Sequence, residues 1–216
     1  MAIAIQIDDA FDIETYDGLI AYVTAHLELD TETAARVPNF IRKGEYRLNR
    51  LVIAPERETS VSLTTVAAEQ AIDLPADFRQ LRNARLVLAT GGSLKQVSPD
   101  ALHDGYTNLA GSPTVFAITE QAIQFGPIPD AVYTINLHYL ARLPSLSATT
   151  PTNWLLSTNA DAYVYSALWQ ACAWMEDLEG ALAFRGELMT IIEELNMSAN
   201  RYRNGGPLAP RVLCVP

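Results

Sequence analysis

Few side chains in this chain of 216 residues have the types and spacing that catalysis or metal binding requires. Its three histidines, His26, His103 and His138, each lie more than four residues from any other His or Cys, which argues against a zinc site. The two cysteines, Cys172 and Cys214, are interpreted as free thiols in a reducing setting, Cys172 on an apolar helix face and Cys214 in the tail. We therefore expect no metal, no cofactor and no cysteine nucleophile.

Adjacent carboxylates are also poor candidates for acid–base catalysis. Asp8-Asp9 and Glu193-Glu194 are neighbours in sequence, and neighbouring residues on a strand or a helix point in different directions. Gly91-Gly92 lacks the spacing and the following Lys of a phosphate-binding loop. One basic cluster lacks the interleaved aromatic residues of a nucleic-acid platform, and a role in ion pairs between subunits fits it as well: Arg79, Arg82 and Arg85. No catalytic residue is predicted.

The composition is that of a chain that can bury a sizeable core and carries little charge. Hydrophobic residues make up 49% of the sequence and charged residues 19%, below the roughly 25% that is usual in soluble domains. No apolar run is long enough to predict a membrane span, and the N-terminus lacks the basic and apolar segments of a signal peptide. The length favours one domain.

The net charge of −10 is spread unevenly along the chain. Residues 1–35 contain eight carboxylates, among them Asp12 and Asp17, and no Lys or Arg, whereas residues 36–57 contain six basic residues and two acidic ones. Four of these bases lie on one predicted helix: Arg42, Lys43, Arg47 and Arg50. Two interpretations are open. The charges are solvated or neutralise one another within one chain, or acidic and basic faces meet between copies in a heterologous contact that can close into a ring.

Helical periodicity marks both ends of the chain. Apolar residues at three- and four-residue spacing predict helices over Tyr16–Leu27, with Thr15 as the cap, and from Pro38 to about Val52. Near the C-terminus, an antiparallel helical pair is predicted within Asn159–Arg203, and its first helix is expected to carry one apolar stripe through Ala162, Tyr165, Trp169 and Cys172. Its aromatic residues exceed what one buried stripe needs, so they belong either to the core or to a patch that faces a partner: Trp154, Tyr163, Trp169 and Trp174.

Between these ends the pattern becomes that of strands. The predicted strands are Val61–Val66, Ala71–Leu74, Ala84–Ala89, Leu94–Val97, Val115–Ile118, Ala122–Phe125 and Tyr133–Leu140, with a short helix from Ser98-Pro99 to about Tyr106. The order of elements favours an α+β fold, in which N-terminal and C-terminal helices form a bundle with an inserted antiparallel β-region. We expect one domain over residues 1–206, helical over 12–54 and 153–203 and β-rich over 58–142, followed by an extended arm over 207–216.

A series of motifs carries a family resemblance. They are Tyr46-Arg47-Leu48-Asn49-Arg50, Ile72-Asp73-Leu74-Pro75-Ala76-Asp77-Phe78 before an Arg-rich turn, Phe125-Gly126-Pro127-Ile128-Pro129, Tyr133 to Tyr139, Pro144-Ser145-Leu146-Ser147, and Thr152-Asn153-Trp154-Leu155-Leu156 leading into Asp161 to Leu168. Their order and spacing resemble the adaptor (head-to-tail connector) proteins of tailed phages, especially short-tailed ones. The resemblance covers most of residues 12–203.

The resemblance implies a virion structural protein that is made in the host cytoplasm and resides in the neck of the particle. Such adaptors form a ring, commonly of twelve copies, under the portal protein, extend the DNA channel and present a surface for the tail or nozzle protein. DNA would pass without sequence-specific binding, and no membrane is implied. The family pattern also implies that a terminal arm grips the portal; by position, its residues here would be Pro207, Leu208, Arg211, Val212 and Leu213.

Three alternatives stay open at this stage. Another neck or tail-completion protein would share most of these features, and only its neighbours in the particle would distinguish it. A small α+β enzyme would show a concave pocket with convergent polar groups. A monomeric binding module would form no ring.

Overall fold

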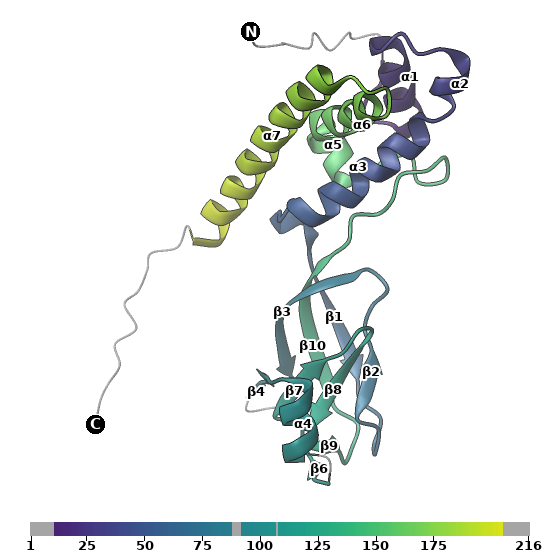
Figure 1. Ribbon diagram of the computed structural model, residues 1–216. Helices are drawn as coiled ribbons and strands as arrows, with labels where there is room; N and C mark the ends of the chain where they lie inside the picture. Colours follow the sequence, from purple (N-terminus) through teal and green to yellow (C-terminus); the bar gives the residue numbers. More distant parts are fainter. Residues whose placement is uncertain (1–10, 88–91, 107, 205–216) are drawn as a thin grey trace. The chain divides into compact units, whose positions relative to one another are not determined.

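The computed structural model describes residues 11–87, 92–106 and 108–204, with side chains described as far as residue 200. The chain divides into two compact units (Figure 1). The helical unit combines Met1–Pro55 with Leu143–Pro216, and the β-rich unit is Glu56–Arg142. The arm expected over 207–216 lies outside the described residues. The predicted α+β class is confirmed.

The helical unit contains six α-helices in its described part. They are α1 (Tyr16–His26), α2 (Thr31–Ala34), α3 (Val37–Leu51), α5 (Trp154–Thr158), α6 (Ala160–Trp174) and α7 (Leu178–Asn204). Thr15 caps α1 as predicted, its side chain accepting a hydrogen bond from the Gly18 N–H, and Asp30 caps α2 in the same way from Thr33. Pro38 lies in the first turn of α3, where its missing N–H is not needed.

Helix α6 is the centre of this unit. Its buried residues lie on nearly all sides of the helix, so the single apolar stripe predicted from Ala162, Tyr165, Trp169 and Cys172 underestimates its burial. Helices α3 and α7 both pack against α6. Of the predicted stripe, Ala162 and Cys172 are buried, whereas Tyr165 and Trp169 are half-buried. One core cluster joins residues of α1, α3, α5, α6 and α7.

The segment that returns the chain to this unit is held by polar side chains of α3. The buried Glu45 carboxylate accepts a hydrogen bond from the Leu146 N–H at 2.7 Å, and the Asn49 side chain accepts one from the Leu143 N–H at 2.8 Å. Asn153 then donates to the Pro144 carbonyl and to the Tyr163 hydroxyl. Burial raises the pKa of Glu45, while the hydrogen bond from Leu146 and the charge of Arg42 act in the opposite direction.

Its described residues give the β-rich unit two four-stranded sheets and one pair of short strands. Its elements are η1 (Pro55–Arg57, whose first residue closes the helical unit), β1 (Glu58–Thr64), β2 (Ala71–Asp73), β3 (Phe78–Leu86), β4 (Gly92–Ser93), β5 (Lys95–Gln96), α4 (Pro99–Tyr106), β6 (Ala110–Gly111), β7 (Val115–Ile118), β8 (Ala122–Gly126), β9 (Ile128–Pro129) and β10 (Thr134–Ala141). The sheet orders are β1-β10-β3-β4, β2-β8-β7-β5 and β6-β9. The main core cluster of this unit draws residues from both four-stranded sheets, among them Leu137 and Phe125.

Two sequence expectations for this unit were wrong in detail. The β-region is not wholly antiparallel, because β5 pairs with β7 and β6 pairs with β9 in parallel. The strand expected at Ala84–Ala89 begins earlier, at Phe78, so the Arg-rich segment after the Leu-Pro-x-Asp-Phe motif is strand and not turn. Alternating exposure along β3 explains the error, since a strand with one half-exposed face can carry polar residues at every second position.

Candidate functional site

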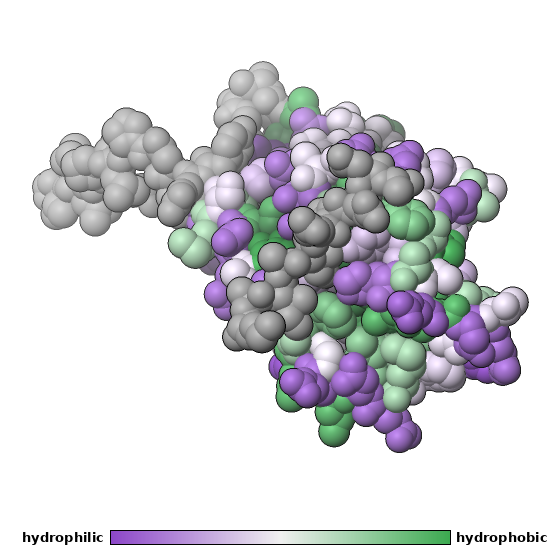
Figure 2. Space-filling model, turned by 90° about the horizontal axis from the view of Figure 1, so that it is seen from above, coloured by the Kyte–Doolittle hydropathy of each residue, from purple (hydrophilic) through white to green (hydrophobic). Residues whose placement is uncertain are grey.

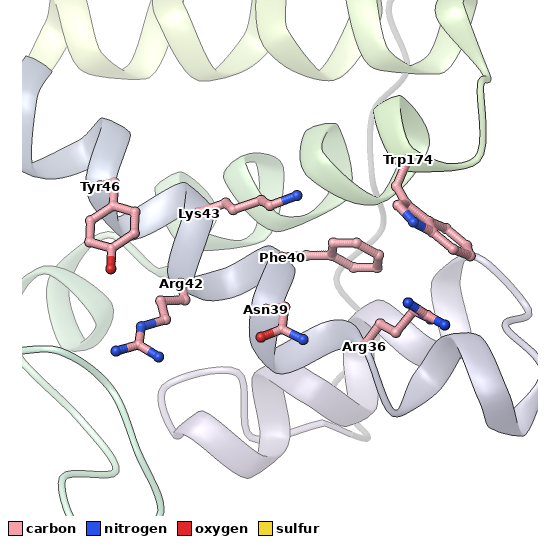
Figure 3. A pocket seen from close by; sticks show the side chains of 7 residues that line it. All are labelled: Arg36, Asn39, Phe40, Arg42, Lys43, Tyr46 and Trp174. Atoms are coloured by element: carbon pink, nitrogen blue, oxygen red, sulfur yellow. The ribbon is translucent and has the colours of Figure 1, made fainter.

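One face of α3 carries the basic residues that the sequence singled out. Arg42, Lys43, Arg47 and Arg50 are all exposed, and the opposite face of the helix is buried through Ile41, Gly44 and Leu48. A recess of about 380 Å³ lies along the basic face (Figure 3). We name its lining the basic surface: Arg36, Asn39, Phe40, Arg42, Lys43, Tyr46 and Trp174.

Aromatic rings give the basic surface a fixed shape. Phe40 and Trp174 lie with ring centroids 5.9 Å apart, and the Arg36 guanidinium stands over the Trp174 ring at 5.2 Å (Figure 3). Further along α3, Arg47 lies 4.3 Å from the centre of the Trp169 ring, which Arg185 of α7 approaches at 5.7 Å. These contacts favour guanidinium positions of Arg36 and Arg47 over the tryptophan rings.

Two of the bases form no ion pair with a carboxylate of the described residues. Arg36 pairs with Glu32 of α2 at 3.6 Å, and the Arg50 Nε donates to the Tyr46 carbonyl. Within the part of the chain that the structure describes, Arg42 and Lys43 form no ion pair. Charge at their exposed ends is therefore available to an external carboxylate.

Of the predicted acidic partners, Asp12 precedes α1 and Asp17 lies in its first turn. Both are exposed, and neither forms an ion pair with a basic side chain of the described residues. Neutralisation of α1 by α3 within one chain is therefore not observed there, apart from the Glu32–Arg36 pair that joins α2 to α3.

A second recess, of about 340 Å³, runs between α6 and α7. We name its lining the acidic groove: Asp161, Val164, Tyr165, Glu187, Thr190, Ile191 and Glu194. Three of these residues are carboxylates, and Val164, Tyr165 and Ile191 supply an apolar floor that is buried or half-buried. Burial first, and then the charges of Glu187 and Asp161, raise the pKa of Tyr165. Sequence reasoning missed this groove, although Glu187 and Glu194 are seven residues apart and therefore share one side of a helix.

Helical geometry places the two charged surfaces on different sides of α7. A helix turns about 100° per residue, so Glu187 and Glu194 lie about 200° and about 180° around α7 from Arg185. Arg185 shares the Trp169 ring with Arg47 of α3, and so it marks the basic side. The acidic groove consequently opens away from that side.

Large apolar side chains are exposed where α6 turns into α7. Trp174, Met175, Leu178 and Leu182 are each more than a third exposed. Seen from above, hydrophobic residues lie at the surface among hydrophilic ones (Figure 2). The sequence left open whether its C-terminal aromatic residues lie in the core or face a partner. Tyr163 belongs to the core at 1% exposure, whereas Trp174 is 44% exposed.

The family model described as SU10 adaptor protein matches residues 14–211. The chain belongs to the SU10 adaptor protein family. It is therefore a phage structural adaptor, which interacts with other structural proteins of the phage particle. No curated protein matches the chain.

One polar constellation of this adaptor lies on β1 and β10 and was not foreseen. The Ser60 Oγ lies 2.8 Å from the His138 Nδ1, and the His138 Nε2 lies 3.3 Å from one oxygen of the Glu58 carboxylate. The other oxygen of that carboxylate pairs with Arg82. Ser60 and His138 face each other in the register of the two strands. The alternating pattern of each strand could have assigned Ser60 and His138 to a face of its own strand. It could not have shown that the two residues lie opposite each other, because the register between strands is not visible in the sequence.

The remaining residues with reactive side chains are separated from one another. Cys172 is buried, and burial first, then Asp177, raises the pKa of its thiol to about 11. Burial lowers the pKa of His26, which stacks on Tyr22. Within the described ranges, no three His, Cys, Asp or Glu side chains are grouped so as to hold a metal ion. No helix in those ranges is both long and apolar enough to cross a membrane.

Proposed function

We propose that this adaptor is the head-to-tail connector of its phage, forming a ring between the portal and the tail and extending the DNA channel. The observation that carries the proposal is that, in this family member, the basic surface and the acidic groove lie on different sides of α7. Both carry exposed charges that form no ion pair among the described residues. Surfaces that differ and face different directions make heterologous contacts, and such contacts close into rings.

Within that ring, α3 supplies the basic half of each subunit contact through Arg42 and Lys43. Arg47 and Arg50 support this half, since Arg47 stacks on Trp169 and Arg50 is tied to the Tyr46 carbonyl. Asp12 and Asp17 are the acidic partners that the charge pattern of the sequence suggests. Twelve copies would match the usual stoichiometry of such rings.

The segment 207–216 is proposed to grip the portal. It contains Pro207, Leu208 and Arg211 and the apolar run Val212-Leu213-Cys214-Val215, so it offers both a charge and an apolar anchor. A partner that binds this segment would be the portal, and the tail or nozzle protein would meet another part of the ring. The net charge of −10 would help DNA to slide past the ring, because like charges repel.

The decisive experiment uses particles assembled in cells from a phage genome that lacks this gene. Purified adaptor added to such heads should bind them and restore tail attachment, and images of the neck should show a ring of this chain under the portal. Binding to assembled tails but not to tail-less heads would identify another neck or tail-completion protein instead. Absence of binding to both would refute the proposal.

Deletion of residues 207–216 tests the arm separately. The shortened chain should keep the helical content and the melting temperature of the full chain, since the described core ends before this segment. It should no longer join the heads. Heads that bind the shortened and the full chain equally well would rule out the arm.

A hydrolytic enzyme is a second candidate because of the Ser60–His138–Glu58 connection alone. That connection has the serine–histidine–carboxylate order of an acyl-transfer triad. Its measurable consequence is turnover of p-nitrophenyl acetate that disappears in Ser60→Ala. Equal rates for the wild-type chain and Ser60→Ala would reject the enzyme and leave these residues as cross-strand polar pairs.

A further inference from the structure

We propose that the basic surface on α3 of one copy docks on the acidic groove between α6 and α7 of the next copy. The inference rests on the ring proposed above and names the acidic half of its subunit contact. In this inference the acidic groove takes the role that the charge pattern of the sequence suggested for Asp12 and Asp17.

The first support is charge that one chain leaves unpaired on both surfaces. Arg42 and Lys43 have no ion-pair partner among the described residues, and the same holds for Glu187 and Glu194. Two cations on one surface therefore match two carboxylates on the other, and Asp161 adds a third carboxylate to the lining of the groove. Opposite potentials on two surfaces steer encounter and fix the register of docking.

The second support is the apolar content of both surfaces. Tyr46 is 58% exposed and Trp174 is 44% exposed on the basic surface. The groove has an apolar floor of Val164, Tyr165 and Ile191 beneath its carboxylates. Aromatic residues and Arg are enriched at protein interfaces, and an apolar centre with charged edges is the usual anatomy of such a contact.

The third support is direction. If both surfaces faced the same way, two copies would satisfy each other and assembly would stop at a dimer. The groove instead opens on the side of α7 that lies about 180° from Arg185, which belongs to the basic side. Each copy can therefore engage one neighbour with its basic surface and another with its groove, as a ring requires.

The test uses two variants of opposite design. In R42E/K43E both surfaces of the chain become acidic, and in E187K/E194K both become basic. Neither variant can join copies of itself, and each should bind tail-less heads at least about tenfold less than the wild-type chain at low salt. An equimolar mixture of the two should recover binding, because each modified surface then meets an oppositely charged one.

Controls separate this pairing from general effects of charge. Glu193 is exposed beside Glu194 but does not line the groove, so E193K should leave binding unchanged where E194K weakens it. Circular dichroism and the melting temperature show whether each variant is folded. Raising the salt concentration should weaken the recovered binding of the mixture, as expected for exposed ion pairs.

The outcomes are distinct. Recovery in the R42E/K43E plus E187K/E194K mixture supports the inference. Recovery when R42E/K43E is instead mixed with D12K/D17K overturns it in favour of the start of α1. If R42E/K43E and E187K/E194K each form rings on heads as well as the wild-type chain does, the inference is overturned while the connector function stays intact. Failure of the wild-type chain itself to join heads is the separate result that refutes the connector function.

Discussion

The close approach of α3 to α6 gives a prediction that can be worked from geometry. Gly44 lies in the interior of α3, where Ala would ordinarily stabilise a helix by about 1 kcal/mol. A Cβ at this position would lie 3.2 Å from the Ser166 Cβ and would overlap the Ser166 Oγ. Overpacking of this kind costs roughly 1–3 kcal/mol, so the clash should outweigh the gain in helix propensity. We expect Gly44→Ala to destabilise the helical unit by about 1–2 kcal/mol.

Ser166 supplies the second half of the prediction. Its hydroxyl is buried and has no hydrogen-bond partner within the described structure. Removing such a group avoids its desolvation cost, and Ser166→Ala should therefore stabilise the unit by about 1 kcal/mol. The double variant G44A/S166A should recover most of the loss, because the overlapping atom is gone while the tight contact between Cβ atoms remains. The two substitutions should thus show a coupling energy of about 1–2 kcal/mol.

The chain provides a suitable probe for this cycle. All three tryptophans lie in the helical unit, at Trp154, Trp169 and Trp174, so their fluorescence during urea denaturation reports on that unit. Midpoints multiplied by the denaturant slope give the four free energies of unfolding. If Gly44→Ala stabilised the unit as it would an exposed helix, or if the two changes were additive, the close contact between α3 and α6 would be refuted. That contact also holds the basic surface next to Trp174, so binding to heads should fall with Gly44→Ala.

Three further predictions concern buried polar groups. Glu45→Gln keeps an acceptor for the Leu146 N–H and removes a charge whose burial raises the carboxyl pKa, so its stability at pH 7 should equal or exceed that of the wild type. Glu45→Ala should instead cost about 1–3 kcal/mol. Because a raised native pKa favours the protonated native state, the wild type should become less stable than Glu45→Gln as the pH rises above about 4.5 through the native pKa. The Tyr139 hydroxyl donates to Asp77 at 2.8 Å, and burial together with this contact raises the pKa of Tyr139 to about 12. The wild type should therefore lose stability between about pH 10 and pH 12, and Tyr139→Phe should lose less, as measured by circular dichroism. In a Cys214→Ser variant the remaining thiol is Cys172, which is buried and has a pKa raised to about 11. This thiol should react with an aromatic disulfide reagent orders of magnitude more slowly in the native than in the denatured chain. Equal rates would contradict its burial.

Element types in the helical unit were predictable because their signals are local. The cap at Thr15, the proline in the first turn of α3 and the apolar spacing of both helical ends are each contained within a few residues. The order of helices, strands and helices likewise indicated the α+β class, and the ordered motifs indicated the adaptor family. The basic residues of α3 were found for the same reason, since all four lie within a few turns of one predicted helix.

The tertiary structure alone decided which charges find partners. The sequence showed an acidic segment followed by a basic one, but neutralisation within a chain depends on distances between side chains that only packing sets. Packing left Arg42 and Lys43 without an ion pair to any described residue, and it stacked Arg47 on Trp169. It also built the acidic groove from Asp161 on α6 and two glutamates of α7. Asp161 is more than twenty residues from Glu187 and Glu194 in the sequence, so no local pattern could relate them. Side-chain periodicity assigns a residue to a face of its own helix, whereas a surface made by two helices exists only once those helices have docked.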